Sequence, residues 1–440
     1  MEHKVFAYKT LDDVRQETEK TGAYIPLSED LSVIAAPLTV GALTLQNRFV
    51  INPMEGCDGT TGGAPDELTF RRYKRFAAGH AGLIWFEAVA ITQEGRANPR
   101  QLMLTAANLD EYKRLLDDIR EEAVSQCGFA PPVILQATHS GRYSRPGSVP
   151  GPMIAYNCPP YEKDKPIGAE HIVSNAYLDS LPEKYAETAR LSREAGFDGV
   201  DVKACHRYLL NELFSAGTRP DSRYGGTLEN RIRLYVDAIR AVCPELSPNM
   251  LLSTRLNVYD GPHDPYCFGA SSGGAVDLTE SLVLVKMLAG LGVSLINVTI
   301  GNPYVCPHVN RPFDAGPYTP PEHPLEGLGR MYSCVSAVKG ACPGQAVVAS
   351  GLSYLRQFSP YAAAGLLASG SADLVGFGRE AFAYPDFAAD ILKKGSLDKN
   401  RCCISCSKCS ALMRAGSTAG CVIRDEVYTQ IYKRDVTDKM

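Results

Sequence analysis

Several features are missing from this chain of 440 residues, and each absence excludes a class of protein. No run approaches the roughly eighteen apolar residues of a transmembrane helix. The N-terminus lacks the apolar segment of a secretory signal, so we expect a cytoplasmic protein without membrane contact. Lysine and arginine number 45 against 49 aspartates and glutamates, a net charge of −4 without the basic excess typical of nucleic-acid binders.

The composition that is present is that of an ordinary globular protein, with 45% hydrophobic and 21% charged residues. Short β-rich runs alternate with longer segments of helical period. The predicted strands are residues 49–52, 82–86, 133–137, 199–203, 251–256, 295–299, 346–350 and 374–377. The helices predicted between them include residues 66–78, 109–125, 182–195, 228–241, 279–290 and 327–339.

This alternation predicts an α/β protein with a parallel sheet, and eight such units predict a (β/α)8 TIM barrel with enlarged loops. We divide the chain into an N-terminal arm (1–36), a barrel (37–395) and a C-terminal segment (396–440). A doubly wound sheet is the alternative. It would place a G-x-G-x-x-G turn after its first strand, whereas residues 53–57 read PMEGC.

Three long loops rich in glycine and proline follow predicted strands, at residues 141–161, 260–274 and 301–327. Loops of this length in a compact domain are usually lids or binding loops, and surface decoration is the alternative. Because barrel active sites lie at the carboxyl ends of the strands, we expect the chemistry there.

The sharpest local signal is the spacing Cys403-x2-Cys406-x2-Cys409-x11-Cys421. Three close thiolates and one distant partner suit a 4Fe-4S cluster, since one tight turn presents three sulfurs and the distant residue closes the fourth corner. Zinc, which also takes four thiolates, and unligated thiols are the alternatives. The adjacent Cys402 could replace Cys403 as the first ligand. A cluster transfers single electrons, so we expect a partner redox centre in the barrel.

Longer motifs carry a family resemblance. Residues 199–214 read GVDVKACHRYLLNELF and residues 218–231 read TRPDSRYGGTLENR. Together with NRF at 47–49, PM at 53–54, QATHSGR at 136–142 and ADLVGFGR at 372–379, they closely resemble the Old Yellow Enzyme family of FMN-dependent oxidoreductases. The resemblance covers about residues 37–395.

The cysteine segment resembles the branch of 2,4-dienoyl-CoA reductase, 2-enoate reductase and trimethylamine dehydrogenase, in which a 4Fe-4S cluster follows the barrel. Those proteins continue into flavodoxin-like and nucleotide-binding domains, which we do not expect here because the chain stops at Met440. Electrons would then come from NAD(P)H docking over the flavin, or from a separate electron-donor protein. A small-molecule substrate and a homo-oligomer are expected as well.

The resemblance implies an FMN site formed by Pro53, Met54, Glu55, Gln136, Arg255, Gly351, Gly378 and Arg379. Gln136 would hydrogen-bond the flavin pyrimidine edge, and Arg255 would stabilise the reduced, anionic flavin. The three residues after strands seven and eight would hold the phosphate, where barrels commonly bind one.

The resemblance also implies a catalytic group. Tyr208 matches the general acid that protonates the α-carbon after hydride leaves flavin N5 for the β-carbon of an activated alkene. His206 matches one of two residues that grip the activating carbonyl, and Lys203 replaces the usual histidine as the other. A lysine brings a full positive charge, so an anionic substrate is favoured. A structural salt bridge is the alternative role for Lys203.

One acid, Glu55, departs from the family pattern, and a second acid, Glu87, is expected near it. Glu55 stands where the family often has threonine or cysteine, and Glu87, at the end of the second strand, is expected to face the same cavity. Arg96 and Arg100, in the loop after that strand, would either clamp an anionic substrate or form a solvated loop. The predicted function is a flavin-dependent oxidoreductase of the ene-reductase type. A dehydrogenase of small amines and an electron-transfer subunit are the alternatives.

Overall fold

The computed structural model describes residues 1–147, 149–219, 223–261 and 267–439. Asp221 and parts of the predicted loops 141–161 and 260–274 lie outside the described residues. Eight parallel strands close into a barrel in the order β10-β3-β4-β5-β6-β7-β8-β9. The strands are β3 (Phe49–Ile51), β4 (Leu83–Ala90), β5 (Val133–Thr138), β6 (Gly199–Val202), β7 (Leu251–Asn257), β8 (Leu295–Thr299), β9 (Ala346–Ala349) and β10 (Leu374–Phe377). The prediction of a (β/α)8 TIM barrel is confirmed.

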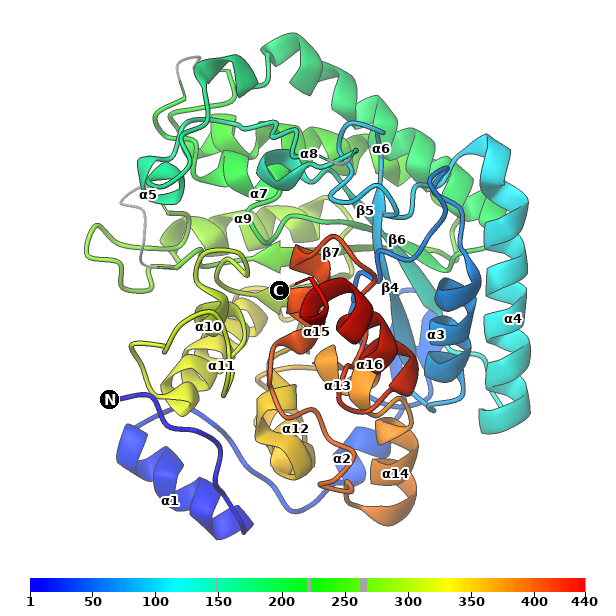
Figure 1. Cartoon of the computed structure of the whole chain (residues 1–440), viewed down its shortest axis with the longest axis vertical. Coiled ribbons are helices and arrows are strands. Elements are labelled where there is room, and N and C mark those ends of the chain that lie inside the picture. The colour runs from blue at the N-terminus through cyan, green and yellow to red at the C-terminus, as the bar shows by residue number, and fades with distance from the viewer. Residues whose placement is uncertain (148, 220–222, 262–266, 440) are drawn as a thin grey trace.

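Helices cover the outside of this barrel (Figure 1). The longer ones are α3 (Glu67–Ala77), α4 (Leu109–Cys127), α6 (Asn175–Ala195), α8 (Leu228–Val242), α9 (Thr279–Gly290), α11 (Pro324–Ala341), α12 (Ser359–Ala368) and α14 (Phe387–Lys394). Shorter helices lie in the loops and the arm: α2 (Ser32–Ala35), α5 (Pro159–Glu162), α7 (Leu209–Phe214), α10 (Pro307–Asn310) and α13 (Arg379–Ala383).

Helix α6 begins two turns earlier than predicted. Proline favours the first turn of a helix, which is why the sequence pattern placed the start at Pro182. The actual N-cap is Ser174, whose hydroxyl accepts a hydrogen bond from the Tyr177 backbone N–H at 3.1 Å. The helix therefore continues through Pro182, which lies inside it.

The bottom of the barrel is closed by a small hairpin that the sequence patterns did not reveal. Its strands β1 (Leu38–Val40) and β2 (Leu43–Leu45) pair antiparallel. Val40 and Leu45 pack into one buried cluster with residues from the barrel strands, among them Trp85 and Leu251. The amino-terminal half of the barrel interior is thus a sealed apolar core.

The carboxyl-terminal half of the interior is polar instead. Asn52, Asn297 and Ser350 form a closed ring of hydrogen bonds between three strands, with donor–acceptor distances of 2.9–3.1 Å. Buried polar groups are stable only when they are satisfied, and this ring satisfies its own members. It forms the floor of the cavity at the open end of the barrel.

The C-terminal segment lies over that open end, where Figure 1 shows its helices in red. It contains α15 (Lys408–Arg414) and α16 (Glu426–Tyr432). Asp425 fixes it to the first barrel helix, because its carboxylate accepts two hydrogen bonds from Arg71, at 2.8 and 3.0 Å, and one from Arg75.

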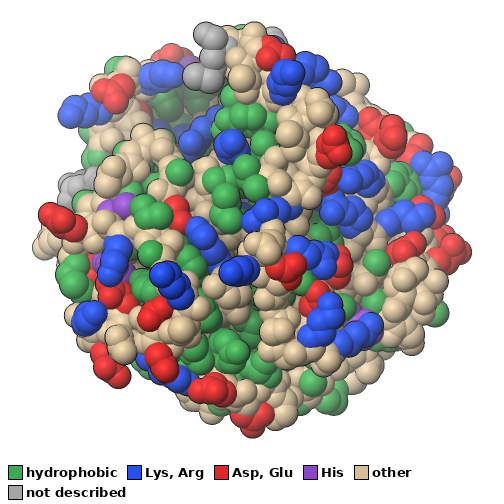
Figure 2. Space-filling view, turned by 60° about the horizontal axis from the view of Figure 1, so that its bottom comes forward, with side chains coloured by type: hydrophobic (Ala, Val, Ile, Leu, Met, Phe, Trp, Pro, Cys, Tyr) green, Lys and Arg blue, Asp and Glu red, His purple; other side chains and the backbone are tan. Residues whose placement is uncertain are grey.

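The N-terminal arm contains helix α1 (Leu11–Thr21), which packs against α11. Charges of both signs are interspersed over the face in Figure 2, in keeping with the small net charge. None of the helices in the described residues is both long enough and apolar enough to cross a lipid bilayer.

Candidate active site

A cleft of about 1220 Å³, including the space open to solvent, lies at the carboxyl ends of the barrel strands. Its walls bring together every residue predicted for the flavin site and for catalysis: Pro53, Met54, Glu55, Gln136, Lys203, His206, Tyr208, Arg255, Gly351, Gly378 and Arg379. They come from six strand ends separated by more than three hundred positions in the sequence. The fold therefore assembles one site from the predicted residues.

Four buried nitrogens on the wall of this cleft have no hydrogen-bond partner within the described residues. They are His206 Nε2, Arg255 Nε, Arg311 Nη1 and Arg379 Nη1. A buried donor without a partner costs free energy, so such groups are rare in the absence of a ligand. Three of the four belong to guanidinium groups. The cleft is thus suited to a ligand rich in acceptors and negative charge.

Arg311 is a site residue that the sequence patterns missed. It follows α10 in the long loop after β8, and its Nη2 donates to Ser410 Oγ on α15 at 2.7 Å. Burial, together with the nearby positive charges of Arg379 and Arg414, lowers the pKa of Arg311 to about 10. An anion between these guanidinium groups would relieve that repulsion. Position after a barrel strand was the only sequence signal, and it did not single out this arginine.

Gln136 is held in one orientation by a buried acid that the predictions also missed. Asp201 Oδ2 accepts hydrogen bonds from Gln136 Nε2 at 2.6 Å and from Trp85 Nε1 at 2.8 Å. Its Oδ1 accepts from the Arg255 backbone N–H at 2.8 Å. Burial raises the pKa of Asp201 to about 6 in spite of these bonds. With its amino group bound to Asp201, Gln136 is left with its carbonyl oxygen as the acceptor for a ligand.

Lys203 lies on the substrate side of the cleft without a salt bridge to any described acid. It is 5% exposed, and its ammonium sits over the ring of Tyr208, 3.9 Å from the ring centre. Burial lowers the pKa of Lys203, and the charge of Glu55 opposes that shift. The salt bridge considered for this residue is absent from the described structure. The positive charge of its ammonium is therefore stabilised by the face of the Tyr208 ring and by more distant charges.

The Tyr208 hydroxyl is hydrogen-bonded to the Tyr304 hydroxyl at 2.9 Å. Tyr208 is buried, whereas Tyr304 is 38% exposed and reaches from the cleft to the surface. The ring of Tyr304 stacks on Tyr143 with centroids 3.7 Å apart. A buried phenol is therefore connected to solvent through a second phenol.

The backbone that presents these side chains is unusual at one point. His206 and Arg207 have positive φ angles of 64° and 58°, a left-handed conformation that costs free energy for residues other than glycine. The Arg207 backbone N–H donates to Asn211 Oδ1 at 2.6 Å, and the Arg207 guanidinium pairs with buried Asp260 at 2.9 Å. These bonds hold the turn that places the imidazole of His206 in the cleft.

Glu55 faces the cleft, and burial raises its pKa although Lys203 and hydrogen bonds from Cys57 and Tyr208 act in the opposite direction. The expectation for Glu87 is wrong, because this acid is not on the cleft wall. Its Oε1 binds Arg72 Nη2 at 2.6 Å, and its Oε2 accepts from the Gly56 backbone N–H at 2.8 Å. The reason is that Arg72 on α3 lies behind the strand ends and draws the carboxylate outward.

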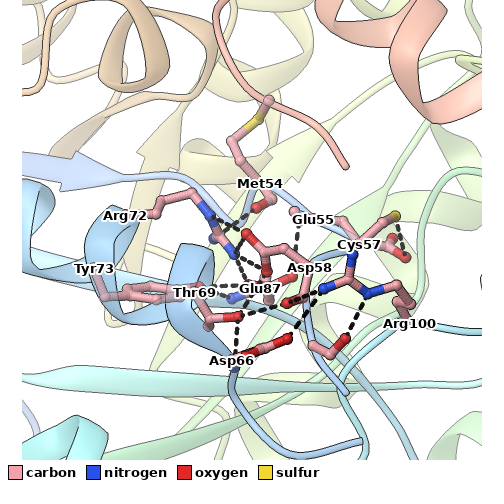
Figure 3. A network of polar contacts seen from close by, with 12 residues as sticks. Met54, Glu55, Cys57, Asp58, Asp66, Thr69, Arg72, Tyr73, Glu87 and Arg100 are labelled. Carbon is pink, nitrogen blue, oxygen red and sulfur yellow. Dashed lines mark hydrogen bonds and ion pairs between the residues drawn. The ribbon is translucent and has the colours of Figure 1, made fainter. Parts of the chain in front are cut away.

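Figure 3 shows this network around the loop that follows β3. The guanidinium of Arg72 also contacts Asp58 at 2.8 Å and the Met54 carbonyl at 3.4 Å. Both acids and the arginine are buried, so two carboxylates share one guanidinium, and burial raises the pKa of Glu87 to about 7. The network fixes the loop so that Glu55 points toward the cleft.

Arg96 and Arg100 do not form the substrate clamp considered above. Arg96 is buried and donates to the carbonyls of Thr61 and Gln101, and Arg100 donates to the Gly59 carbonyl at 2.8 Å. Neither lines the cleft. Both arginines instead tie together the loops that follow β3 and β4.

The four predicted cluster ligands, Cys403, Cys406, Cys409 and Cys421, line one small cavity beside the cleft, and Cys409 lies on the wall of both. Among the described residues, no three His, Cys, Asp or Glu side chains are arranged to hold a metal ion. Cys402 also borders this cavity, but its Sγ donates to the Asp398 carbonyl at 3.4 Å. The Cys402 thiol is thus directed into a hydrogen bond of its own.

A model of the NADH:flavin oxidoreductase / NADH oxidase family matches residues 34–303. The chain belongs to this family. A NADPH dehydrogenase of Geobacillus thermodenitrificans is 30% identical over 275 residues, which are 61% of this chain and 73% of the relative. A second NADPH dehydrogenase, from a Geobacillus species, is 31% identical over 217 residues, or 48% of this chain and 60% of the relative.

Solved structures of similar fold include a 2-naphthoyl-CoA reductase, with a TM-score of 0.73 and 19% identity over 89% of this chain and 57% of that one. The old yellow enzyme homologue from Zymomonas mobilis has a TM-score of 0.62 and 23% identity over 83% and 94% of the two chains. The chain therefore spans little more than half of the first structure and nearly all of the second. These two likenesses concern the fold.

As a member of this flavin oxidoreductase family, the protein is an enzyme, and FMN is the cofactor that its cleft must accommodate. FMN combines a charged phosphate with a pyrimidine edge that carries both acceptors and a donor. The unpartnered guanidinium nitrogens of Arg255, Arg311 and Arg379 and the fixed carbonyl of Gln136 match these groups. The residues of the cleft therefore fit FMN.

Proposed function

We propose that this enzyme uses FMN and a 4Fe-4S cluster to reduce the activated C=C bond of an enone or enoate. NAD(P)H or a separate electron-donor protein would be the source of electrons. One observation carries the proposal: the ammonium of Lys203, the unpartnered Nε2 of His206 and the hydroxyl of Tyr208 face the same cleft as the FMN-binding residues.

FMN would be held along the line of strand ends from β5 to β10. The Gln136 carbonyl would accept from the pyrimidine N–H, and Arg255 would donate to the same edge. Arg379 and Arg311 would bind the phosphate, at the side of the barrel where phosphate commonly binds. Gly351 has φ of 92°, a conformation that favours glycine, and it lines the cleft where that phosphate would lie.

The substrate carbonyl would lie between His206 and Lys203. Bound FMN would supply the hydride that adds to the β-carbon. Negative charge then develops on the carbonyl oxygen, and both residues would stabilise it with hydrogen bonds that strengthen as the charge grows. Because the site is buried, these electrostatic interactions are stronger than they would be in water.

Tyr208 would donate its hydroxyl proton to the α-carbon. The phenolate that remains would accept a hydrogen bond from Tyr304, 2.9 Å away, and recover a proton through this solvent-exposed residue. Burial raises the pKa of Tyr208 well above its usual value, so the hydroxyl stays protonated until the α-carbon needs its proton. A positioned acid of this kind contributes about 10²–10⁴ in rate.

The cluster would be held by Cys403, Cys406, Cys409 and Cys421 and would pass single electrons to or from the flavin site. Cys409, on the wall of both cavities, lies where the two cofactors would meet. A single zinc ion fits less well, since it needs its four thiolates to converge at one point. The hydrogen bond of Cys402 favours Cys403 as the first ligand.

The amine-dehydrogenase alternative is disfavoured by charge. Arg255, Arg311 and Arg379 would be occupied by FMN, so the cations left for a substrate on the cleft wall are Lys203 and Arg414. Glu55 is the only acid among the described wall residues, and burial raises its pKa. A positively charged amine would be repelled by this surface, whereas an enolate-like or carboxylate-bearing substrate would be attracted.

The test is an anaerobic comparison of half-reactions. The holoenzyme is reduced with NADPH or dithionite, then mixed in a stopped-flow instrument with a panel of enones, enoates and small amines. We expect Tyr208→Phe to leave flavin reduction nearly unchanged and to slow reoxidation by the alkene about 10²–10⁴-fold. Reoxidation by no alkene, together with reduction of the oxidised enzyme by an amine, would overturn the proposal.

Tyr143→Phe is the matched control. Its ring stacks on Tyr304 and lies 6.0 Å from the Tyr208 ring between centroids, but its hydroxyl accepts a hydrogen bond from Asn302 at 2.8 Å, whereas the Tyr208 hydroxyl is bonded to Tyr304. Loss of this hydroxyl should leave reoxidation within a few-fold of the wild-type rate. An equal effect of both substitutions would indicate packing of the tyrosines instead of proton donation.

A further inference from the structure

Besides the cleft and the cysteine cavity, another cavity, of about 750 Å³ including its opening to solvent, adjoins the cleft. We call it the second cavity. The two share the wall residues Glu55, Tyr304, Met413 and Arg414. Its other walls are formed by Cys57 after β3, by Ala97 and Asn98 after β4, and by residues 142–145 and Pro150 after β5. It therefore opens from the substrate side of the cleft.

The position of this cavity excludes it as a flavin pocket. The residues that would hold the FMN phosphate, Gly351 and Arg379, follow β9 and β10; both line the cleft, and neither lines the second cavity. The second cavity lies over β3, β4 and β5. An FMN oriented by those phosphate contacts leaves it free for another part of the reaction.

The chemistry of the second cavity is cationic at one end. Arg414 is exposed at the C-terminal end of α15 and forms no ion pair among those recorded for the described residues, and Arg145 adds a second guanidinium. Arg142 is neutralised by Glu162 at 2.7 Å and Glu212 at 2.5 Å. Ser144 is 1% exposed and belongs to this wall, and its buried hydroxyl has no hydrogen-bond partner among the described residues.

Between these polar groups and the cleft the walls are apolar. The stacked rings of Tyr143 and Tyr304, with Met413 and Pro150, form a surface suited to an aromatic or aliphatic spacer. Glu55 is the one carboxylate among the wall residues. A ligand that extends from the cleft along this surface meets Arg414 on the wall that the cleft and the second cavity share, and Ser144 and Arg145 on the wall of the second cavity.

We propose that the second cavity binds the distal end of an elongated substrate, an apolar or aromatic spacer that ends in a carboxylate held by Arg414 and Ser144. This deepens the proposed function, on which it rests, by assigning a specificity site remote from the reacting bond. Lys203 would then act at the carbonyl and Arg414 at the tail.

The test uses two probes of the same size: benzylideneacetone with a para-butoxy chain, and its counterpart whose chain ends in a carboxylate. Their saturated ketone products, which cannot react, are titrated into oxidised holoenzyme by calorimetry. We expect the acid to bind roughly tenfold or more tightly than the neutral probe, an advantage that declines with added salt. Arg414→Gln should remove this preference, and Arg414→Lys should restore part of it.

Arg434→Gln is the control, because it removes the same charge from the surface of the same segment, away from both cavities. Ser144→Ala provides a second variant without a change of charge and should lower the preference several-fold. Equal binding of both probes to the wild type, no binding of the acid, or equal effects of Arg414→Gln and Arg434→Gln would overturn the inference. Turnover of the two enones tests the reductase proposal separately, since binding of the saturated pair does not depend on it.

Discussion

A buried ammonium without a direct counter-ion governs the substrate side of the site. Lys203 contacts the face of Tyr208 at 3.9 Å, and a buried charge of this kind gains from an anionic partner. We expect Lys203→Met to weaken kcat/KM for carboxylate-bearing alkenes by about 1.5–3 kcal/mol and to affect matched esters much less. The measurement is kcat/KM for acid and ester pairs. Equal losses for acid and ester would show that Lys203 only polarises the carbonyl.

The orientation of Gln136 depends on Asp201, and the raised pKa of Asp201 makes the free energy of unfolding depend on pH. The folded-state pKa of Asp201 is raised to about 6 from an unfolded value near 3.9, so the folded protein binds the proton more tightly. Its contribution to stability is present below about pH 4 and is lost as the pH rises through about 6. Relative to Asp201→Asn, we expect wild type to lose about 3 kcal/mol of unfolding free energy over that window. The check is urea unfolding across this pH range, with exposed Asp117→Asn as a control that should show no such trend.

The sequence motifs identified the site residues that match a family pattern. They missed the residues that belong to the site only because the folded chain brings them to the cleft. Gln136, Arg255 and Tyr208 stand in recognisable motifs. Arg311 and Tyr304 stand in a long loop without periodicity, so only the folded chain shows that both reach the cleft. Glu87 was misplaced because the direction of its carboxylate is decided by Arg72, a partner fifteen positions away on another element.

At the scale of elements, the eight strands follow from hydrophobic patterning because a buried parallel strand is nearly continuous in apolar residues. Hydrophobic patterning did not predict the hairpin of β1 and β2. Each of its strands has three residues, too few for a period to show. Its burial depends on the barrel floor into which Val40 and Leu45 pack. Short elements stabilised by distant partners cannot be inferred from local sequence.

The C-terminal cysteine segment supplies the sharpest prediction about an element. Cys409→Ser should lose the iron of the cluster while the barrel remains folded, because three thiolates hold a four-iron cluster poorly. Cys402→Ser should retain it, since the Cys402 thiol donates to Asp398. The measurement is iron content and visible absorbance of anaerobically purified protein, with circular dichroism as the check of folding. Zinc in place of iron, or iron loss in Cys402→Ser alone, would contradict the ligand assignment.

At the scale of the whole molecule, the contact between Asp425 and the arginines of α3 joins the C-terminal segment to the first helix of the barrel. Asp425 also caps α16, accepting from the Val427 backbone N–H at 3.2 Å. We expect Asp425→Ala to destabilise the C-terminal segment by about 2–3 kcal/mol, through loss of the cap and of a partly buried ion pair. Hydrogen exchange should then accelerate in the C-terminal segment but not in β5–β8. Uniform acceleration would show that the segment and barrel unfold as one unit.

The roof that α15 provides over the cleft also dictates when the site can form. Asn52 and Met54 leave the ribosome early, but the wall that they share with Ser410, Met413 and Ala419 is complete only after those residues have been synthesised. Until then, the open end of the barrel exposes its polar interior to water. Cofactor loading is therefore expected only after residues 410–419 have emerged from the ribosome. A polypeptide that stalls before them would carry a folded barrel that cannot retain its flavin.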